Sequence, residues 1–540
     1  MKLFYSCLFF VIVILVVSCA VQVAPEGGLK DSEPPHLVSS KPPNYSTSFP
    51  GKEIELNFDE YVSLNEISSQ LIVSPLLKYS PETRIRKKSI LIKIRDTLLE
   101  NTTYTMNFGQ GIMDNNEGNK LDNFQFVFST GSIIDSLDIT GKIIKAIDLK
   151  TEKGILAMLY NKSDDSLPYL ERPVYFSRTN DSGQFRISNI SPGDYKLVGL
   201  KEADGNYLYT PGEEMIGFND NPVSANSENV NLKVFNEVTS VRLLRAYSEF
   251  PGKAVLVFNT SADTLQWKWL TDTTKLKIFA QNYSKESDTI SIWYKNIASD
   301  SLSFYFNHKS SNDTVTLRLF KKTDEVKGRK GPAMEISNGE NQTTVQDLYL
   351  PYHLQCNRPI EKAEFDKIIF LEDSLPVKPQ YVFTDSLKMN INVNHKWKPK
   401  GRYSFFIPSG TFTDIYGNKN DTVKIEFITH GENDYGSITI KFQKTDSVPY
   451  VVQLIDDKSS VYREFKTTTD TVIELTNLDP RVYNVKFIQD INGNGKWDTG
   501  NYLKKIQPEN IDFYPEPITV RANWDVEVFI KAPLMKKLVD

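Results

Sequence analysis

Apolar and polar residues alternate along most of this chain with a period of two. The alternation is clear at 53–58, 89–94, 288–294 and 313–319. Successive side chains of a strand point to opposite faces, so this pattern predicts strands with one buried face. Asn, Asp, Gly and Pro separate the segments, and no long helical pattern competes. We therefore predict an all-β fold of tandem β-sandwich domains in an extended multi-domain arrangement.

The first residues carry a different pattern. Lys2 precedes an apolar run at 8–17, which is about half of the roughly twenty residues that a membrane-spanning helix needs. Ser18 and Cys19 follow, and together with the two valines before them they resemble the lipobox of bacterial lipoprotein signal peptides. The resemblance implies cleavage before Cys19 and lipid on its thiol, with 1–18 as signal peptide. An ordinary secretory signal or a short anchor helix are the alternatives.

Length and composition add limits to this picture. A chain of 540 residues exceeds a single core, so several domains are expected. The net charge of -5 argues against nucleic acid as a partner. Cys7 lies in the signal peptide and Cys19 accepts the lipid, so only Cys356 remains in the folded part. One cysteine makes neither an internal disulfide nor a zinc cage.

A strand–turn–strand pattern occurs twice, at 104–131 and at 403–431. Each copy has a Tyr-led strand, a turn built on Asp and Gly-Asn, and a closing strand. The spacing from glycine to the final threonine is the same in both, from Gly111 to Thr130 and from Gly410 to Thr429. We call these copies A units.

A second pattern follows each A unit. The segment 189–197 is echoed by 477–485, and in both a Pro-containing turn leads into a Tyr-led strand. Each copy then enters a loop rich in Asp, Gly and Asn, at 204–206 and at 490–498. With these B units, the chain has the order A, B, linker domain, A, B.

The A units resemble the Ig-like domain of S-layer (SbsA-type) proteins that is common in Bacteroidota lipoproteins. Asp114, Gly118-Asn119 and the Phe-Ser-Thr-Gly at 128–131 carry this resemblance, and the second copy departs from it with His430. The B units resemble the transthyretin-like regulatory domain of carboxypeptidases. The segments 140–142, 182–185 and 192–195 carry it in the first copy, whereas the second has Arg481 in place of the turn glycine.

These modules are structural or binding units in the families they resemble, which implies a protein without catalytic residues. The predicted domains are the signal peptide 1–18, a flexible tether 19–33, an Ig-like domain 34–132, a transthyretin-like domain 137–235, an unnamed β domain 236–345, a second Ig-like domain 346–431 and a second transthyretin-like domain 432–535.

One loop carries a candidate metal-binding pattern that resembles the Ca²⁺ loop of EF-hands. Its oxygen donors would be the side chains of Asp490, Asn492, Asn494 and Asp498 and the backbone carbonyl of Lys496. No helical pattern flanks the loop, and Asn501 stands where an EF-hand has its bidentate Glu. A Ca²⁺ site and an Asx-rich hairpin loop that bonds its own backbone are the two alternatives. No other cofactor is expected.

Patterns of catalytic residues are missing. The histidines, His36, His308, His353, His395 and His430, lie in different segments without metal-binding spacing. The sequence has no nucleophile elbow, phosphate-binding glycine loop or Cys/His pair. We predict that the protein is not an enzyme.

The sequence Asp-Ser/Thr followed by a small or aliphatic residue recurs, and it resembles the O-glycosylation sequon of Bacteroidota. The alternative is that Asp closes a turn and Ser or Thr opens a strand. The candidate acceptors are Thr97, Ser136, Ser166, Thr264, Thr273, Thr289, Ser301, Thr314, Ser374, Ser386, Thr422, Ser447 and Thr471.

These features together predict a lipid-anchored envelope scaffold or accessory subunit. Its partners would be the membrane and other envelope proteins, including an outer-membrane β-barrel complex for assembly or transport. The alternative is a surface lipoprotein for glycan binding or adhesion, with Trp267, Trp269 and Trp293 as its platform. Ala20 replaces the Asp that retains lipoproteins at the inner membrane, and no acidic cluster follows. This favours the periplasmic face of the outer membrane.

Overall fold

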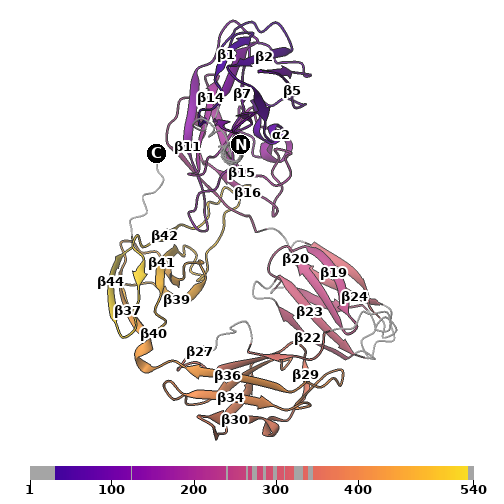
Figure 1. Ribbon diagram of the computed structural model, residues 1–540, viewed down its shortest axis with the longest axis vertical. Coiled ribbons are helices and arrows are strands. Elements are labelled where there is room, and N and C mark those ends of the chain that lie inside the picture. The colour runs from indigo at the N-terminus through magenta and orange to yellow at the C-terminus, as the bar shows by residue number, and fades with distance from the viewer. Residues whose placement is uncertain are drawn as a thin grey trace, which may run out of the picture.

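The computed structural model describes residues 31–122, 124–238, 241–262, 265–270, 277–283, 288–295, 301–308, 311–320, 332–338 and 345–532. Strands dominate these ranges and form five successive sandwiches, which confirms the all-β, multi-domain prediction (Figure 1). We call them the first A unit, first B unit, middle domain, second A unit and second B unit. The described helices are single turns: α2 (Ile67–Gln70), α3 (Leu167–Leu170), η1 (Phe365–Lys367) and η2 (Glu432–Asp434).

The first A unit packs a four-stranded sheet, β1-β2-β6-β5, against a three-stranded sheet, β10-β7-β4, and a small third sheet, β3-β8-β9, completes it. Alternate residues of these strands fill one core that includes Leu56, Ile90 and Phe126. The strands are β1 (Leu37–Lys41), β2 (Glu53–Phe58), β3 (Val62–Leu64), β4 (Ile72–Ser74), β5 (Glu82–Arg86), β6 (Ser89–Lys93), β7 (Thr103–Asn107), β8 (Ile112–Asp114), β9 (Lys120–Leu121) and β10 (Gln125–Ser129).

The second A unit repeats this topology, with sheets β26-β28-β33-β32 and β27-β36-β34-β30-β31 and the pair β29-β35. Equivalent side chains of the two A units make equivalent hydrogen bonds. The hydroxyl of Tyr104 accepts a hydrogen bond from the backbone amide of Leu99 at 2.9 Å. The hydroxyl of Tyr403 accepts one from the backbone amide of Lys398 at 2.8 Å. The strands are β26 (Ile336–Ser337), β27 (Val345–Gln346), β28 (Tyr352–Cys356), β29 (Ile360–Ala363), β30 (Ile369–Glu372), β31 (Leu375–Pro376), β32 (Gln380–Phe383), β33 (Asn390–Asn394), β34 (Arg402–Ile407), β35 (Phe412–Asp414) and β36 (Val423–Thr429).

The first B unit has the sheets β14-β11-β18 and β13-β12-β15-β16, with β17 beside β15. In the first of these sheets, the central strand β11 pairs with β18 in parallel. Tyr195 donates to the carbonyl of Ser191 at 2.8 Å and fixes the turn before β15. The strands are β11 (Leu137–Lys145), β12 (Leu156–Tyr160), β13 (Tyr175–Arg178), β14 (Gln184–Ile190), β15 (Asp194–Lys201), β16 (Met215–Phe218), β17 (Val223–Ser224) and β18 (Val230–Val234).

The second B unit has the same strand order, β40-β37-β44 and β39-β38-β41-β42, with β43 beside β41. Here Tyr483 donates to the carbonyl of Asp479 at 3.0 Å, as Tyr195 does in the first B unit. The strands are β37 (Gly436–Gln443), β38 (Tyr450–Ile455), β39 (Val461–Thr467), β40 (Thr471–Leu478), β41 (Val482–Gln489), β42 (Ile511–Phe513), β43 (Ile518–Thr519) and β44 (Asp525–Lys531).

The middle domain is also a two-sheet sandwich, with sheets β19-β20-β23-β22 and β21-β24-β25. Its core includes Leu256, Ile290 and Phe304. The strands are β19 (Leu243–Phe250), β20 (Lys253–Phe258), β21 (Gln266–Trp269), β22 (Lys277–Tyr283), β23 (Thr289–Lys295), β24 (Ser301–His308) and β25 (Ser311–Arg318).

Neighbouring domains pack through specific contacts. Asn189 of the first B unit donates to Thr105 of the first A unit at 2.9 Å. The middle domain meets the second A unit at a hydrophobic cluster that contains Phe250 and Trp293, and Tyr416 donates across this junction to the carbonyl of Gly252 at 2.6 Å.

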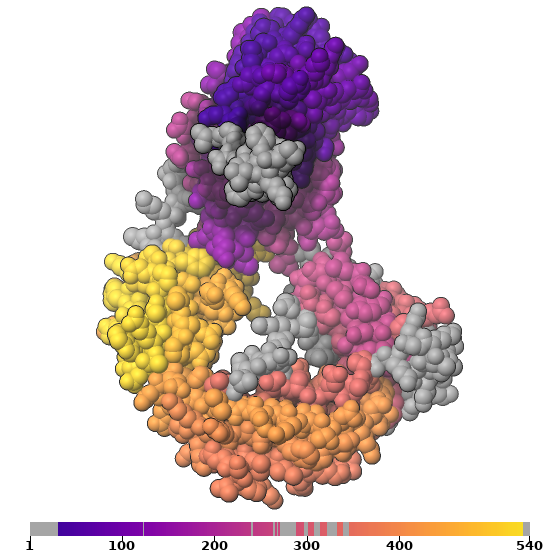
Figure 2. All heavy atoms as spheres, in the orientation of Figure 1, coloured from indigo at the N-terminus to yellow at the C-terminus, as the bar shows by residue number. Residues whose placement is uncertain are grey.

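The chain folds back so that its last domain contacts its second domain. The second B unit lies against the first B unit, and the four later domains enclose an opening (Figure 2). The first A unit projects from this frame (Figure 1). Among the described residues, no helix has the length and apolar character needed to cross a membrane.

Candidate functional site

The loop between β41 and β42, residues 490–510, contains the predicted Ca²⁺ ligands and the contact with the first B unit. We call it the docking loop. Its first residue, Asp490, is only 4% exposed. One carboxylate oxygen, Oδ2, accepts the amide of Gly495 at 2.7 Å. The other, Oδ1, is buried without a hydrogen-bond partner.

Three of the four side chains predicted for the cation site come together, those of Asn492, Asn494 and Asp498. Asn492 and Asn494 both donate their side-chain amides to Oδ2 of Asp498, at 2.5 and 2.7 Å. The backbone amide of Lys496 donates to Oδ1 of Asn494 at 2.8 Å. The side chain of Lys496 is exposed. The group of Lys496 that is predicted to bind the cation is its backbone carbonyl. Positive φ angles of 72° and 74° at Gly493 and Gly495 permit the tight turn.

Glu509 is a central residue of this loop that the sequence did not reveal. Its two carboxylate oxygens accept the amides of Ile491 at 2.7 Å and Asp498 at 3.0 Å, so it ties the two ends of the candidate site together. Burial raises the pKa of Glu509, and the nearby charges of Asp498 and Asp490 add to this effect. Glu509 lies eleven residues beyond Asp498, which is why no motif spacing identifies it.

The first B unit has the same loop design. Glu214 takes the place of Glu509 and accepts the amides of Ala203 and Thr210 at 2.8 and 2.9 Å. In both loops, side chains accept hydrogen bonds from backbone amides of the same loop. This is the hydrogen bonding expected of an Asx-rich hairpin loop. Among the described residues, no group of three His, Cys, Asp or Glu side chains is gathered as around a metal. Any cation at 490–498 would therefore depend on amide and carbonyl oxygens beside the two aspartates.

The second half of the docking loop inserts Tyr502 into the first B unit. Tyr502 is fully buried in a cluster that also holds Tyr160, Phe235 and Trp497. Its ring lies 5.3 Å from Phe218 in an edge-to-face contact. Aromatic pairs of this geometry add to the free energy of burial.

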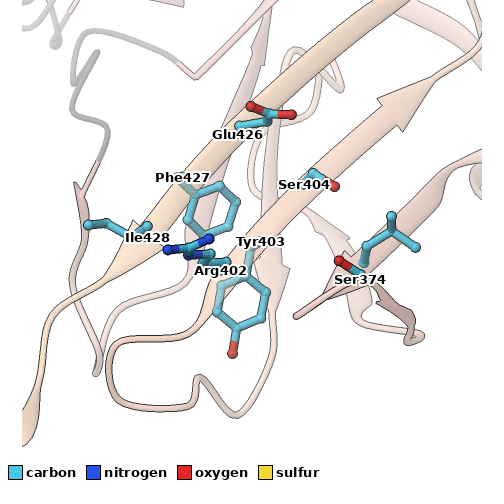
Figure 3. A pocket seen from close by; sticks show the side chains of 8 residues that line it. Ser374, Arg402, Tyr403, Ser404, Glu426, Phe427 and Ile428 are labelled. Atoms are coloured by element: carbon cyan, nitrogen blue, oxygen red, sulfur yellow. The ribbon is translucent and has the colours of Figure 1, made fainter.

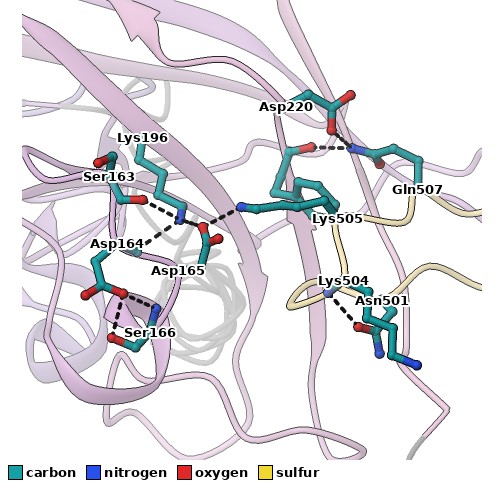
Figure 4. A network of polar contacts seen from close by, with 11 residues as sticks. Ser163, Asp164, Asp165, Ser166, Lys196, Asp220, Asn501, Lys504, Lys505 and Gln507 are labelled. Atoms are coloured by element: carbon teal, nitrogen blue, oxygen red, sulfur yellow. Dashed lines mark hydrogen bonds and ion pairs between the residues drawn. The ribbon is translucent and has the colours of Figure 1, made fainter.

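Polar contacts also join the docking loop to the first B unit, and Figure 4 shows those of Lys505 and Gln507. Lys505 pairs with Asp165 of the first B unit, and Lys196 reaches the same carboxylate. Gln507 donates to the carbonyl of Phe218 at 3.0 Å. The hydroxyl of Thr499 donates to the carbonyl of Asn236 at 2.6 Å. The docking loop therefore joins the two B units by packing and by directed bonds.

The remaining predicted sites are scattered over the surface or lie outside the described residues. Cys19 is outside them, as are Thr264 and Thr273. Cys356 is buried, and burial raises the pKa of its thiol to about 12. Of the candidate glycosylation residues, Thr97, Ser136, Thr314, Ser374, Ser386, Thr422 and Ser447 are exposed, and Ser166, Thr289, Ser301 and Thr471 are half-buried.

A second polar cluster that the sequence did not reveal lies in the second A unit. Oε2 of Glu372 contacts Nε2 of His395 at 2.6 Å and accepts the hydroxyl of Tyr403 at 3.1 Å, while Lys398 lies 2.5 Å from Oε1. Burial opposes ionisation, but these hydrogen bonds outweigh it and lower the pKa of Glu372 to about 2. The cluster joins β30, β34 and the segment after β33, which fits a structural role.

A hollow on the same unit is lined mainly by residues of β34 and β36. Figure 3 shows its side chains on β34 and β36. Arg402 and Glu426 are the charged residues in its lining. The full lining is Leu371, Ser374, Arg402, Tyr403, Ser404, Glu426, Phe427 and Ile428.

The comparisons with known proteins identify the first A unit. The family of bacterial Ig-like domains matches residues 31–130, so the chain contains an Ig-like domain of bacterial type. No curated protein matches the sequence.

Several solved structures share low similarity with the chain. The N-terminal part of the bacterial S-layer protein SbsC has 12% identity and a TM-score of 0.14, and the match covers 53% of this chain and 44% of that one. BcpA, the major pilin subunit of Bacillus cereus, has 10% identity and a TM-score of 0.15, covering 73% and 99%. The match thus spans less than half of the SbsC structure. TM-scores this low establish no shared arrangement of domains.

Proposed function

We propose that this protein is a non-enzymatic, lipid-anchored envelope scaffold or accessory subunit. The observation that carries the proposal is the packing of the second B unit on the first through Tyr502. A chain of sandwiches that is joined at both B units presents its surfaces in a fixed relation, as a scaffold requires. The bacterial Ig-like domain at the N-terminal end also supports an envelope role.

The glycan-binding alternative has less support. Trp293 is only 2% exposed, and it packs at the junction with the second A unit. Trp269 packs against the core of the middle domain. The side chain of Trp267 lies outside the described residues. Aromatic platforms for sugars need exposed ring faces, and Trp269 and Trp293 do not provide one.

The proposed anchor is lipid on Cys19, with the chain on the periplasmic face of the outer membrane and with an outer-membrane β-barrel complex as partner. Affinity purification of the native protein from detergent-solubilised membranes tests this assignment. We expect a barrel protein among the stoichiometric partners and loss of membrane association in Cys19→Ser. Recovery of the native protein without any envelope partner would contradict the accessory role.

We further propose that some of the exposed Asp-Ser/Thr sites carry O-glycans. Thr97, Ser136 and Ser386 are exposed in the folded units and therefore open to modification after folding. The intact mass of the native protein tests this directly. A mass equal to that of the lipidated chain alone would contradict it.

A further inference from the structure

Oδ1 of Asp490 is a buried carboxylate oxygen without a hydrogen-bond partner at the start of the docking loop. The sister oxygen accepts the amide of Gly495 across the turn, which directs the carboxylate into the loop. A buried charged oxygen without a partner is unfavourable and rare, and an ion is one group that satisfies it.

Oxygen donors gather around the same turn. The carboxylate of Asp498 already draws in two amide groups, and the side-chain oxygens of Asn492 and Asn494 face backbone amides of the turn. The ammonium of Lys466 lies close to Gly495, so a cation already sits beside this turn. Carboxylate, amide and carbonyl oxygens on a flexible glycine-containing loop suit Ca²⁺ better than the smaller Mg²⁺.

We propose that the loop binds one Ca²⁺ through Asp490 and Asp498, the two asparagines between them and the carbonyl of Lys496, and that this ion holds the docking loop against the first B unit. With only two carboxylates, its dissociation constant should lie in the range of extracellular modules, about 10⁻⁴–10⁻³ M.

Ion binding is coupled to the contact between the B units because the residues next to Asp498 take part in that contact. Thr499, which bonds to Asn236, directly follows Asp498. Trp497 directly precedes Asp498 and packs in the cluster that receives Tyr502. Its indole nitrogen donates to the carbonyl of Glu509 at 2.9 Å. Fixing Asp498 with an ion therefore fixes the residues on both sides of it, and these belong to the contact between the B units.

The equivalent loop of the first B unit supplies a control. It has Thr210 in place of Asp498, and none of its carboxylate oxygens is buried without a partner in the described structure. Asp204→Asn removes a charge from that loop and should leave Ca²⁺ binding unchanged.

The test uses the full-length chain in detergent, with calorimetric titration of Ca²⁺ and hydrogen–deuterium exchange with and without the ion. We expect one site in the native chain and in Asp204→Asn, and its loss in Asp498→Asn. Lys466→Ala should tighten binding because it removes a competing cation. At a Ca²⁺ concentration near 100 times the dissociation constant, exchange should slow about tenfold or more in 499–510 and also in 233–238.

Each alternative outcome overturns part of the proposal. Absence of binding, binding that survives in Asp498→Asn, or loss of binding in Asp204→Asn would overturn the site. Binding that slows exchange only within 490–498 would overturn the coupling to the first B unit.

Discussion

The backbone amide of Tyr502 donates a hydrogen bond of 2.6 Å to Glu237, a residue 265 positions earlier in the chain. The other carboxylate oxygen of Glu237 accepts the hydroxyl of Tyr209 at 2.8 Å. Tyr209 and Tyr502 belong to the equivalent loops of the two B units. One carboxylate at the exit of the first B unit therefore holds both loops and the start of the linker to the middle domain.

Tyr502→Ala should weaken this contact strongly. The side chain is fully buried, and its removal leaves a cavity among aromatic rings. Such changes cost about 3–5 kcal/mol. Denaturant unfolding followed by tryptophan fluorescence measures the loss.

Lys504→Ala is the matched control for Tyr502→Ala, because its side chain is exposed on the same loop. It should change stability by no more than about 0.5 kcal/mol. Equal effects of the two substitutions would contradict the anchoring role of Tyr502.

The second A unit should lose stability in acid because of Glu372. Its pKa is lowered from 4.5 to about 2 in the folded state. A depressed carboxyl pKa stabilises the fold at pH values above the unfolded pKa, and this contribution is lost as the pH falls from about 4.5 to about 2. The loss is on the order of 3 kcal/mol.

Glu372→Gln tests the acid effect. The variant should be less stable than the native chain at pH 7, and its stability should depend less on pH between 5 and 2. Melting temperatures recorded across this pH range provide the measurement. The same acid slope in the variant and in the native chain would assign the effect to other carboxyls.

Arg358→Ala should destabilise the junction between the middle domain and the second A unit. Arg358 lies 3.3 Å from Asp414, and their side chains are 7% and 0% exposed. Its guanidinium also stacks on Phe250 of the middle domain. Removing one partner of a buried pair costs about 3–5 kcal/mol. Urea unfolding measures this cost, and Arg402→Ala on the exposed sheet face should be nearly neutral.

The features that could be predicted from the sequence are those that depend on residues of a single domain. The alternation around Leu56 and Ile90 identified core strands, because strand geometry fixes which side chains face inward. The repeated spacing around Tyr104 and Tyr403 identified equal folds, because both tyrosines hold the same kind of turn. Asn492 and Asp498 are hydrogen-bonded in the structure, because a nine-residue turn leaves their side chains little freedom.

Contacts between distant segments were not predictable in the same way. Lys505 and Asp165 lie in ordinary polar loops, and nothing in their local pattern distinguishes them from solvated charges. Glu372 and His395 come together only when β30 and the segment after β33 meet. Periodicity reports which face of a strand is buried, but it does not report which other domain covers a loop.

Cys19→Ser should release the chain from the membrane. Lipid on the cysteine supplies the proposed anchor, and stable anchoring needs more than one acyl chain. Metabolic labelling with a palmitate analogue should mark the native chain and not the variant. Labelled Cys19→Ser protein in the membrane fraction would contradict lipidation at this residue.

Zero-length carbodiimide crosslinking of the full-length chain tests the docking of the two B units most directly. The reagent forms an amide bond between a lysine amine and a carboxylate that are already in contact. Lys505 and Asp165 should therefore be crosslinked within single chains. Lys505→Arg keeps the charge but removes the reactive amine, and the crosslink should disappear. Asp165 crosslinked to Lys196 alone, with no link between the two B units, would contradict the docked arrangement.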